Sequence, residues 1–232
     1  MRVLVTRPEP GAAKTAARLH KMGHEAVVAP LSRVVAVEGA TKPVGAFDAV
    51  AVTSANALIS ASSPLLEVIR TLPCFAVGER TAEAAKDAGF EDVGSAGGDV
   101  HDLAAMITTR LSRDAEVLYL CGTRRRPVLE DALRDAGFGV TPVETYGIEP
   151  VRYGAAERNK LIAGAPLDAM LVYSRFSAEL LSDFLGDRGD LRVLCMSRHV
   201  ADGLSHSLRK SAEIASAPTE DSLLALLSRA SR

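Results

Sequence analysis

Tryptophan is absent from this 232-residue chain, and the other aromatic residues, six Phe and four Tyr, are scarce. Proteins that bind single-stranded nucleic acid stack bases on aromatic side chains, so this composition argues against that class. The formal net charge is −2, so the chain also lacks the positive excess with which general nucleic-acid binders hold a phosphate backbone. We expect no nucleic-acid partner, although a local basic patch is compatible with these numbers.

Cysteine is also scarce. The three cysteines, Cys74, Cys121 and Cys195, lie in or beside apolar runs that are typical of strands. None of them has the close Cys or His spacing of a zinc site. We predict reduced thiols in the core of a cytoplasmic protein, and no metal. The five histidines are scattered along the chain, and we assign none of them a catalytic role.

Long apolar runs are missing too. No stretch approaches the roughly 20 residues that a membrane helix needs, and the first residues enter a strand without an apolar signal segment. We therefore expect no membrane partner. Hydrophobic residues still make up 47% of the chain, which is enough for a packed core in one large or two small domains.

Glycine-rich nucleotide loops of the two common kinds are absent. The chain has no Gly-x-x-x-x-Gly-Lys-Ser/Thr loop, and no Gly-x-Gly-x-x-Gly follows the first apolar run. A nucleotide-dependent enzyme is thus an alternative class that the motifs do not favour.

Repeated strand–turn–helix units are present instead. In one of them an apolar run at residues 74–77 ends at Gly78, and residues 81–88 are rich in helix-favouring Ala, Glu and Lys. Gly89 stands where a helix C-cap belongs. The Thr81 hydroxyl would then lie at a helix N-terminus, where free backbone N–H groups can hold an anion. For this unit alone, a turn with a cap is the favoured explanation, and the other units change that weighting.

The first unit has the length of a parallel crossover. Residues 3–6 and 25–29 predict strands, and residues 12–22 between them predict a helix, which implies a right-handed connection. Further along the chain, residues 198–208 predict one helix. Residues 30–46 and 147–154 predict extended linkers.

An internal repeat indicates two similar domains. Residues 47–54 resemble residues 167–174, and residues 92–96 resemble residues 213–217. Another unit, at residues 3–27, resembles residues 117–140, so it comes first in one copy and last in the other. The simplest explanation is that one domain is inserted in the other.

The predicted architecture is therefore α/β, with two similar lobes that are each a small parallel sheet flanked by helices. Residues 1–33 and 150–232 form the outer domain, and residues 38–146 form the inserted one. The two linkers are expected to pair as an antiparallel two-stranded ribbon. Ligands of such sheets bind at the carboxyl ends of the strands, so we expect a cleft between the lobes.

Arginines, small hydroxyl residues and helix N-termini follow the predicted strands, and that set suits carboxylates or phosphates. Exposed basic turns without function would give a similar pattern. The candidate substrate-binding residues are Arg7, Ser54, Asn56, Gly78, Thr81, Arg124, Arg125, Ser174, Ser177 and Arg198.

The ordered set of motifs resembles the uroporphyrinogen-III synthase family over nearly the whole chain. The matching motifs are Val-Leu-Val-Thr-Arg-Pro at 3–8, Phe-Asp-Ala-Val-Ala-Val-Thr-Ser-Ala-Asn-Ala at 47–57, Val-Gly-Glu-Arg-Thr-Ala-Glu-Ala-Ala at 77–85 with Ala-Gly-Phe at 88–90, Pro-Val-Glu-Thr-Tyr at 142–146 and Val-Tyr-Ser-Arg-Phe-Ser-Ala at 172–178. None of these motifs is specific by itself, but their order is.

The resemblance implies an enzyme of tetrapyrrole and heme biosynthesis that uses no metal and no organic cofactor. Such an enzyme cyclises hydroxymethylbilane to uroporphyrinogen III, with loss of water and inversion of the last pyrrole ring. The substrate, a linear tetrapyrrole, carries acetate and propionate on every ring, which suits the predicted anion-binding residues.

The resemblance also carries over individual residues. The family's linker tyrosine matches Tyr146, its inner-lobe hydroxyl matches Thr81, and its outer-lobe serine turn matches Ser174 and Ser177. The family usually has a second Gly-x-x-Thr-Ala turn, which here reads Ser-Arg-His-Val-Ala at 197–201. Valine stands in the threonine's place, and Arg198 or the histidine after it could substitute.

Tyr146 is the candidate catalytic residue, as a hydrogen-bond donor to the leaving hydroxyl group. A tyrosine at this position could equally be a packing residue of the hinge. We expect a monomer. The alternative function is a two-lobed sensor module that binds small anions or sugars without catalysis, although sugar sensors would be expected to offer more aromatic surface.

Overall fold

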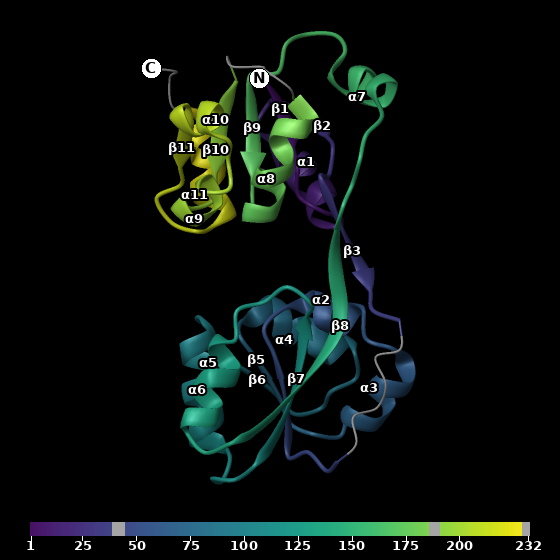
Figure 1. The fold of residues 1–232 in the computed structure, drawn as a ribbon, viewed down its shortest axis with the longest axis vertical. Helices are drawn as coiled ribbons and strands as arrows, with labels where there is room; N and C mark the ends of the chain where they lie inside the picture. Colours follow the sequence, from purple (N-terminus) through teal and green to yellow (C-terminus); the bar gives the residue numbers. More distant parts are fainter. Residues whose placement is uncertain (39–44, 186–190, 229–232) are drawn as a thin grey trace. The chain divides into compact units, whose positions relative to one another are not determined.

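The computed structural model describes residues 1–38, 45–185 and 191–228. The chain forms two compact units. Unit 1 contains Met1–Arg33 and Glu149–Arg232, and unit 2 contains Val34–Ile148. Each unit is a sheet with helices packed on it (Figure 1). Residues 39–44, which belong to the first predicted linker, lie outside the described residues.

The sheet of unit 1 has the strand order β11-β10-β9-β1-β2, and all its pairs are parallel. Its strands are β1 (Arg2–Val5), β2 (Glu25–Val28), β9 (Ala169–Val172), β10 (Arg192–Cys195) and β11 (Ala212–Ile214). The two parts of the chain meet where β1 pairs with β9, with Val3 opposite Ala169. Helices cover both faces of these strands, so their sequences are continuous apolar runs.

The helices of unit 1 build one apolar cluster on each face of the sheet. They are α1 (Gly11–Lys21), α7 (Ala155–Ile162), α8 (Arg175–Leu185), α9 (Arg198–Ala201), α10 (His206–Lys210), α11 (Glu220–Leu224) and the 3-10 helix η1 (Ala225–Ser228). One cluster includes Leu181 of α8, and the other includes Leu19 of α1 with Leu223 of α11.

The single helix predicted at residues 198–208 is wrong. The chain leaves α9 at Ala201 and enters α10 only at His206. Gly203, between the two, lies so close to α8 that an added Cβ would be 2.7 Å from the Arg175 carbonyl oxygen. Glycine has a low helix propensity, and packing against α8 fixes the break at this position.

The second sheet has the strand order β3-β8-β7-β4-β5-β6. Its strands are β3 (Ser32–Ala36), β4 (Ala49–Val52), β5 (Cys74–Ala76), β6 (Val93–Ser95), β7 (Glu116–Gly122) and β8 (Gly139–Pro150). The pairs from β8 to β6 are parallel. Along β3 and β8 the Val37 N–H donates to the Thr145 oxygen (3.0 Å) and the Val151 N–H donates to the Leu31 oxygen (2.9 Å). Residue numbers therefore rise along one strand as they fall along the other, so this pair is antiparallel (Figure 1).

The fold class predicted from the sequence is confirmed: both sheets are mainly parallel, helices flank them, and two paired strands connect the units. The predicted pairing of the two linkers as an antiparallel ribbon is confirmed, because β3 pairs with the part of β8 that continues to Pro150. This pairing satisfies the backbone groups of the extended stretch.

The helices of unit 2 are α2 (Ala55–Ile59), α3 (Ser63–Ile69), α4 (Glu79–Asp87), α5 (Val100–Arg110) and α6 (Val128–Asp135). Gly89 and Gly137 follow α4 and α6, each with φ of +93°, a conformation that favours glycine at a helix end. Within the described ranges, no helix combines the length and the apolar character needed to cross a membrane.

Candidate active site

Most of the residues that the sequence singled out in unit 2 lie at one edge of its sheet. β4 ends at Val52, β5 at Ala76 and β7 at Gly122. Val52 is opposite Ala76 where β4 pairs with β5, and opposite Leu120 where β4 pairs with β7, so these parallel strands end side by side. The turns that follow them bring together Ser54, Asn56, Gly78, Thr81, Arg124 and Arg125.

Ser54 is the N-cap of α2. Its Oγ accepts a hydrogen bond from the Asn56 N–H at 3.3 Å, so the hydroxyl satisfies one of the free donors at the start of the helix. The Asn56 side chain, on the first turn of α2, is partly exposed.

Gly78 is the N-cap of α4 and contributes no side-chain cap. The N–H groups of Thr81 and Ala82 both donate to the Gly78 oxygen at 3.0 Å, so those of Glu79 and Arg80 precede the first helical hydrogen bond. An added Cβ at Gly78 would meet no atom within 4 Å. The backbone donors at this helix end therefore border open space.

Thr81 lies in the first turn of α4, not at its start, because the helix begins at Glu79. Its residue surface is almost fully buried. The helix was predicted to start at residue 81, two residues too late, but Thr81 does lie in the N-terminal turn of α4.

Tyr146 lies on β8 opposite Gly122, the last residue of β7. A bulge shifts the register here, because Cys121 is opposite Glu144 while Gly122 is opposite Tyr146. The ring packs so closely on Gly122 that an added Cβ would be 2.7 Å from its Cζ and 3.0 Å from its hydroxyl oxygen. No hydrogen bond within the described part of the chain uses the Tyr146 hydroxyl, so it is available as a donor at this edge.

Arg125 is held by two carboxylates. Its Nε donates to Glu130 at 2.7 Å, and its Nη1 donates to Glu144 at 2.8 Å and to the Gly122 oxygen at 3.2 Å. Burial would lower the pKa of Arg125, but these hydrogen bonds outweigh burial and raise it. Arg125 thus ties the turn after β7 to β8 beside Tyr146.

In unit 1, four residues that follow three strands were predicted to bind substrate: Arg7 after β1, Ser174 and Ser177 after β9, and Arg198 after β10. Ser174 follows β9 and caps α8: its Oγ accepts from the Ser177 N–H (3.1 Å) and donates to the Ser177 Oγ (2.9 Å). Ser177 is fully buried, so it orients Ser174 in this structure. Arg198, which begins α9, is exposed and has no ion-pair partner among the described residues.

Arg7 follows β1 and stacks on Tyr173, with its Cζ 4.3 Å from the ring centroid. Its Nη1 donates to Glu220 at 3.2 Å and to Thr15 at 3.4 Å. Sequence reasoning missed Glu220, because it lies far along the chain on α11 and no local motif marks it.

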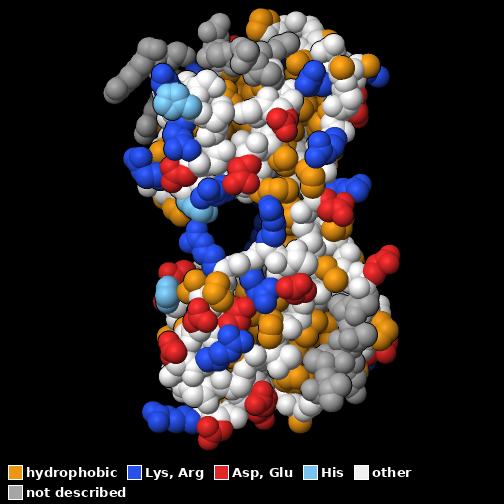
Figure 2. Space-filling view, viewed as in Figure 1, with side chains coloured by type: hydrophobic (Ala, Val, Ile, Leu, Met, Phe, Trp, Pro, Cys, Tyr) orange, Lys and Arg blue, Asp and Glu red, His pale blue; other side chains and the backbone are white. Residues whose placement is uncertain are grey.

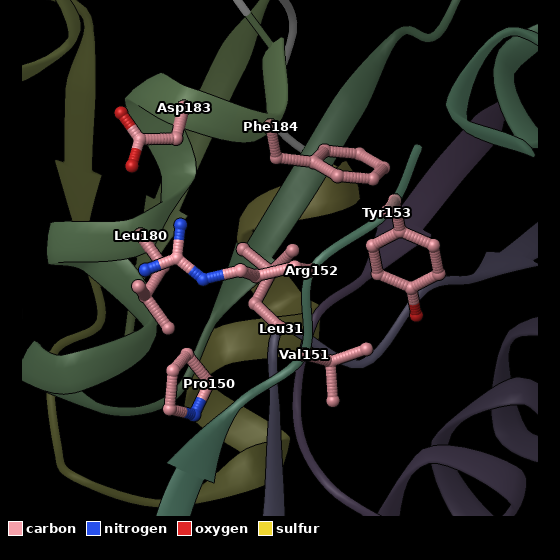
Figure 3. Close-up of a pocket in the computed structure, with 8 residues that line it drawn as sticks. All are labelled: Leu31, Pro150, Val151, Arg152, Tyr153, Leu180, Asp183 and Phe184. Atoms are coloured by element: carbon pink, nitrogen blue, oxygen red, sulfur yellow. The ribbon is translucent and has the colours of Figure 1, made fainter. Parts of the chain in front are cut away.

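A groove of about 260 Å³ in unit 1 was also missed by the sequence. Its apolar wall is formed by Leu31, Leu180 and Phe184. Figure 3 shows the Arg152 guanidinium extending across this wall towards α8, on the side where Asp183 lies. Tyr153 points away, and its hydroxyl donates to the Pro30 oxygen at 3.0 Å. The groove runs along α8 rather than at the strand ends, and none of the predicted residues lines it.

The charges around these edges are mixed. On the face drawn in Figure 2, acidic and basic side chains are intermixed over each unit. Among the described residues, no group of three or more His, Cys, Asp and Glu side chains could hold a metal ion. The three cysteines are free and buried, as predicted, and burial raises the pKa of each thiol to about 12.

Comparisons with known proteins agree on one family. The model of the family described as uroporphyrinogen-III synthase HemD matches residues 13–225. The uroporphyrinogen-III synthetase of Helicobacter pylori has a similar structure, with a TM-score of 0.70, 20% identity and coverage of 98% of each chain. A mutant uroporphyrinogen III synthase of the extremely thermophilic bacterium Thermus thermophilus gives a TM-score of 0.54 and 18% identity, over 98% of this chain and 96% of that one. Among curated proteins, no sequence matches this chain.

Proposed function

The chain belongs to the uroporphyrinogen-III synthase family, and from this premise we propose which of its residues carry out the family's reaction. The reaction converts hydroxymethylbilane to uroporphyrinogen III, with loss of water and inversion of the last pyrrole ring. The enzyme is a cyclising lyase of tetrapyrrole and heme biosynthesis. The match of the family model to most of the chain carries this conclusion, and a sensor module without catalysis is not favoured.

The carboxylates of the substrate bind, in this proposal, at the strand ends of the two sheets. The backbone N–H groups of Glu79 and Arg80 support this, since they border the open space over Gly78. Arg198 supports it as an exposed guanidinium at a helix start. Ser54, Asn56, Thr81, Arg124 and Ser174 complete the proposed set.

Arg125 and Ser177 have a different place in the proposal. Their polar groups are already bonded to Glu130, Glu144 and Ser174, so they orient the neighbouring turns. Substrate binding then depends on many hydrogen-bond donors, some of them main-chain N–H groups. Substitution of any one side chain should therefore weaken substrate binding without abolishing it.

Tyr146 acts as the donor to the leaving group. As the C–O bond of the hydroxymethyl group breaks, the phenol gives its proton to the departing oxygen, which leaves as water, and the pyrrole nitrogen supplies the electron pair. The pyrrole N–H proton then passes to the phenolate, which restores the phenol and gives the neutral azafulvene. The last ring then attacks through its substituted carbon to give a spiro intermediate. The protein's main task in that step is to position the rings and exclude water.

Tyr146→Phe tests this role. We expect the rate of type III formation to fall about 10²-fold with the fold intact, because the ring is kept and the donor is lost. The measurement is the ratio of type III to spontaneous type I isomer formed from hydroxymethylbilane. Tyr153→Phe is the matched control: it removes a hydroxyl that donates to the Pro30 oxygen and should leave the rate unchanged. A wild-type rate in Tyr146→Phe would remove this residue from the mechanism.

We further propose that the protein works as a monomer in the cytoplasm. Free, buried thiols support a reducing compartment. Light scattering of the purified protein should give the 24.5 kDa mass of one chain, and twice that mass would contradict a monomer.

A further inference from the structure

Glu220 collects donors from three other elements of unit 1. It is the first residue of α11, and its side chain is 23% exposed. Its Oε1 accepts from Thr15, from Tyr173 (3.0 Å) and from Arg7 (3.2 Å), and its Oε2 accepts from Arg18 (3.0 Å). This carboxylate therefore connects α1, the end of β1 and the end of β9.

The packing of α11 fixes the position of Glu220. Thr219 caps the helix by accepting from the Ser222 N–H at 3.3 Å. Below it, four leucines of α11 and η1 are buried in the cluster that also contains Ala12 and Leu19 of α1. The buried leucines are Leu223, Leu224, Leu226 and Leu227.

Glu220 is ionised near neutral pH. Burial would raise its pKa, but the hydrogen bonds from Thr15 and Tyr173 and the charge of Arg7 outweigh burial and hold the pKa below its usual value. Burial raises the pKa of Tyr173 to about 12, so the phenol remains a neutral donor. Arg7 is thus held by a charged carboxylate on one side and by an aromatic ring on its face.

The contacts of Arg7 leave one edge of its guanidinium unused. Within the described residues, its hydrogen bonds to other side chains all use Nη1. The Nε and Nη2 atoms form the fork that binds a carboxylate with two parallel hydrogen bonds. Arg192 of this chain uses these two atoms to hold Glu213, at 2.8 and 3.2 Å.

Gly11 makes this arrangement of Arg7 possible. An added Cβ at Gly11 would be 2.5 Å from the Arg7 Nε and 3.0 Å from its Nη2. Glycine at the start of α1 thus gives the guanidinium room to lie over its backbone, where any side chain would displace it.

We propose that Glu220 is a positioning residue for the family's reaction: by holding Nη1 of Arg7, it presents the Nε–Nη2 fork to a carboxylate of the tetrapyrrole at the end of β1. This rests on the proposed function and on the sequence-based prediction that Arg7 binds substrate. Two other roles would leave the same contacts, a tether for the C-terminal helix and a carboxylate that competes with substrate for Arg7.

Steady-state kinetics with hydroxymethylbilane separate these roles. We expect Glu220→Ala to raise KM about tenfold and to change kcat by less than about twofold, because Arg7 loses its fixed orientation. Glu220→Gln keeps an acceptor oxygen and should raise KM by only about threefold. Asp221→Asn, the matched control on the same helix turn, removes an exposed partner of Arg18 and should change neither constant.

A double-substitution cycle provides the second test. Arg7→Ala should raise KM, and adding Glu220→Ala to it should raise KM no further. Binding of uroporphyrin III, followed by its fluorescence, should show the same pattern in Kd without any turnover. If Glu220→Ala does not fold, Glu220→Gln with and without Arg7→Ala gives the answer.

The other roles predict different results. An unchanged KM with a lower melting temperature would identify a tether, and a lower KM would identify a competitor; either result overturns the proposal, as does an additive effect in the double variant. Failure of the proposed function would be visible already in the wild-type enzyme, as the absence of type III isomer above the spontaneous type I product.

Discussion

Single residues at the strand ends fall into two groups, those with open polar groups and those already bonded within the protein. Gly78 and Arg198 belong to the first group, since an added Cβ at Gly78 would meet no atom and Arg198 is exposed. Tyr146 joins them because no hydrogen bond within the described residues uses its hydroxyl. Arg7 and Arg125 belong to the second, because carboxylates hold them in place. An ion pair of this kind fixes the orientation of a long side chain before substrate binds. Without the ion pair, substrate binding would itself have to order the side chain, at a cost in conformational entropy.

Gly122→Ala tests the placement of Tyr146. A Cβ at this position would be 2.7 Å from the ring, so the ring must move. We expect type III formation to fall by more than about tenfold and the free energy of unfolding to fall by about 1–3 kcal/mol. Rate and thermal melting are measured together. Gly147→Ala, where the nearest atoms are 3.5 Å away, is the control and should change both little. A full rate in a destabilised Gly122→Ala protein would speak against Tyr146.

The positions of single residues could be predicted from the sequence where they follow from strand order. The residues after β4, β5 and β7 could be placed at one edge because parallel strands end together. Tyr146 was singled out only by the family resemblance. The acidic partners Glu130, Glu144 and Glu220 could not be found, because tertiary packing brings them to the arginines and no local spacing marks them. Because these partners were not predicted, Arg125 looked like an open anion-binding group, and the hold of Glu220 on the Nη1 of Arg7 was not foreseen.

Secondary-structure elements were predicted best where glycine ends a helix. Gly89 was expected to end a helix, and it adopts positive φ directly after α4. The prediction of one helix at residues 198–208 was wrong because a contact with another element decided it: α8 packs against Gly203. The predicted pairing of the two linkers was right, since β3 pairs with the extended end of β8.

Gly78→Ala tests the proposed anion site at the start of α4. The added Cβ meets no protein atom, so the cost in unfolding free energy should be below about 1 kcal/mol. It would occupy the open space beside the first N–H groups, so KM for hydroxymethylbilane should rise about fivefold or more. Gly154→Ala is the same change at the N-cap of α7, also without a close neighbour, and should leave KM unchanged. Equal KM values in the two variants would argue against the site.

The whole molecule shows why a repeat was visible in the sequence. Helices cover both faces of the central strands in each sheet, so each copy of the repeated sequence contains continuous apolar runs. The discontinuous layout of unit 1 follows from the pairing of β1 with β9, which the order of the repeated units indicated. The sequence does not fix which side chains fill each core, because many apolar sets pack equally well.

Alkaline pH should destabilise the whole molecule through its buried thiols. Burial raises the pKa of Cys195 from 9.0 to about 12, so between these values the unfolded chain has lost a proton that the folded protein still holds. Stability is therefore fully present below pH 9 and falls as the pH rises towards 12. Urea unfolding measured from about pH 8 to 11 should show this decline. In Cys195→Ala the free energy of unfolding should fall less steeply with pH, by an amount that corresponds to at most one proton. Asp221→Asn should leave the slope unchanged, and an equal slope in Cys195→Ala would show that this thiol does not contribute.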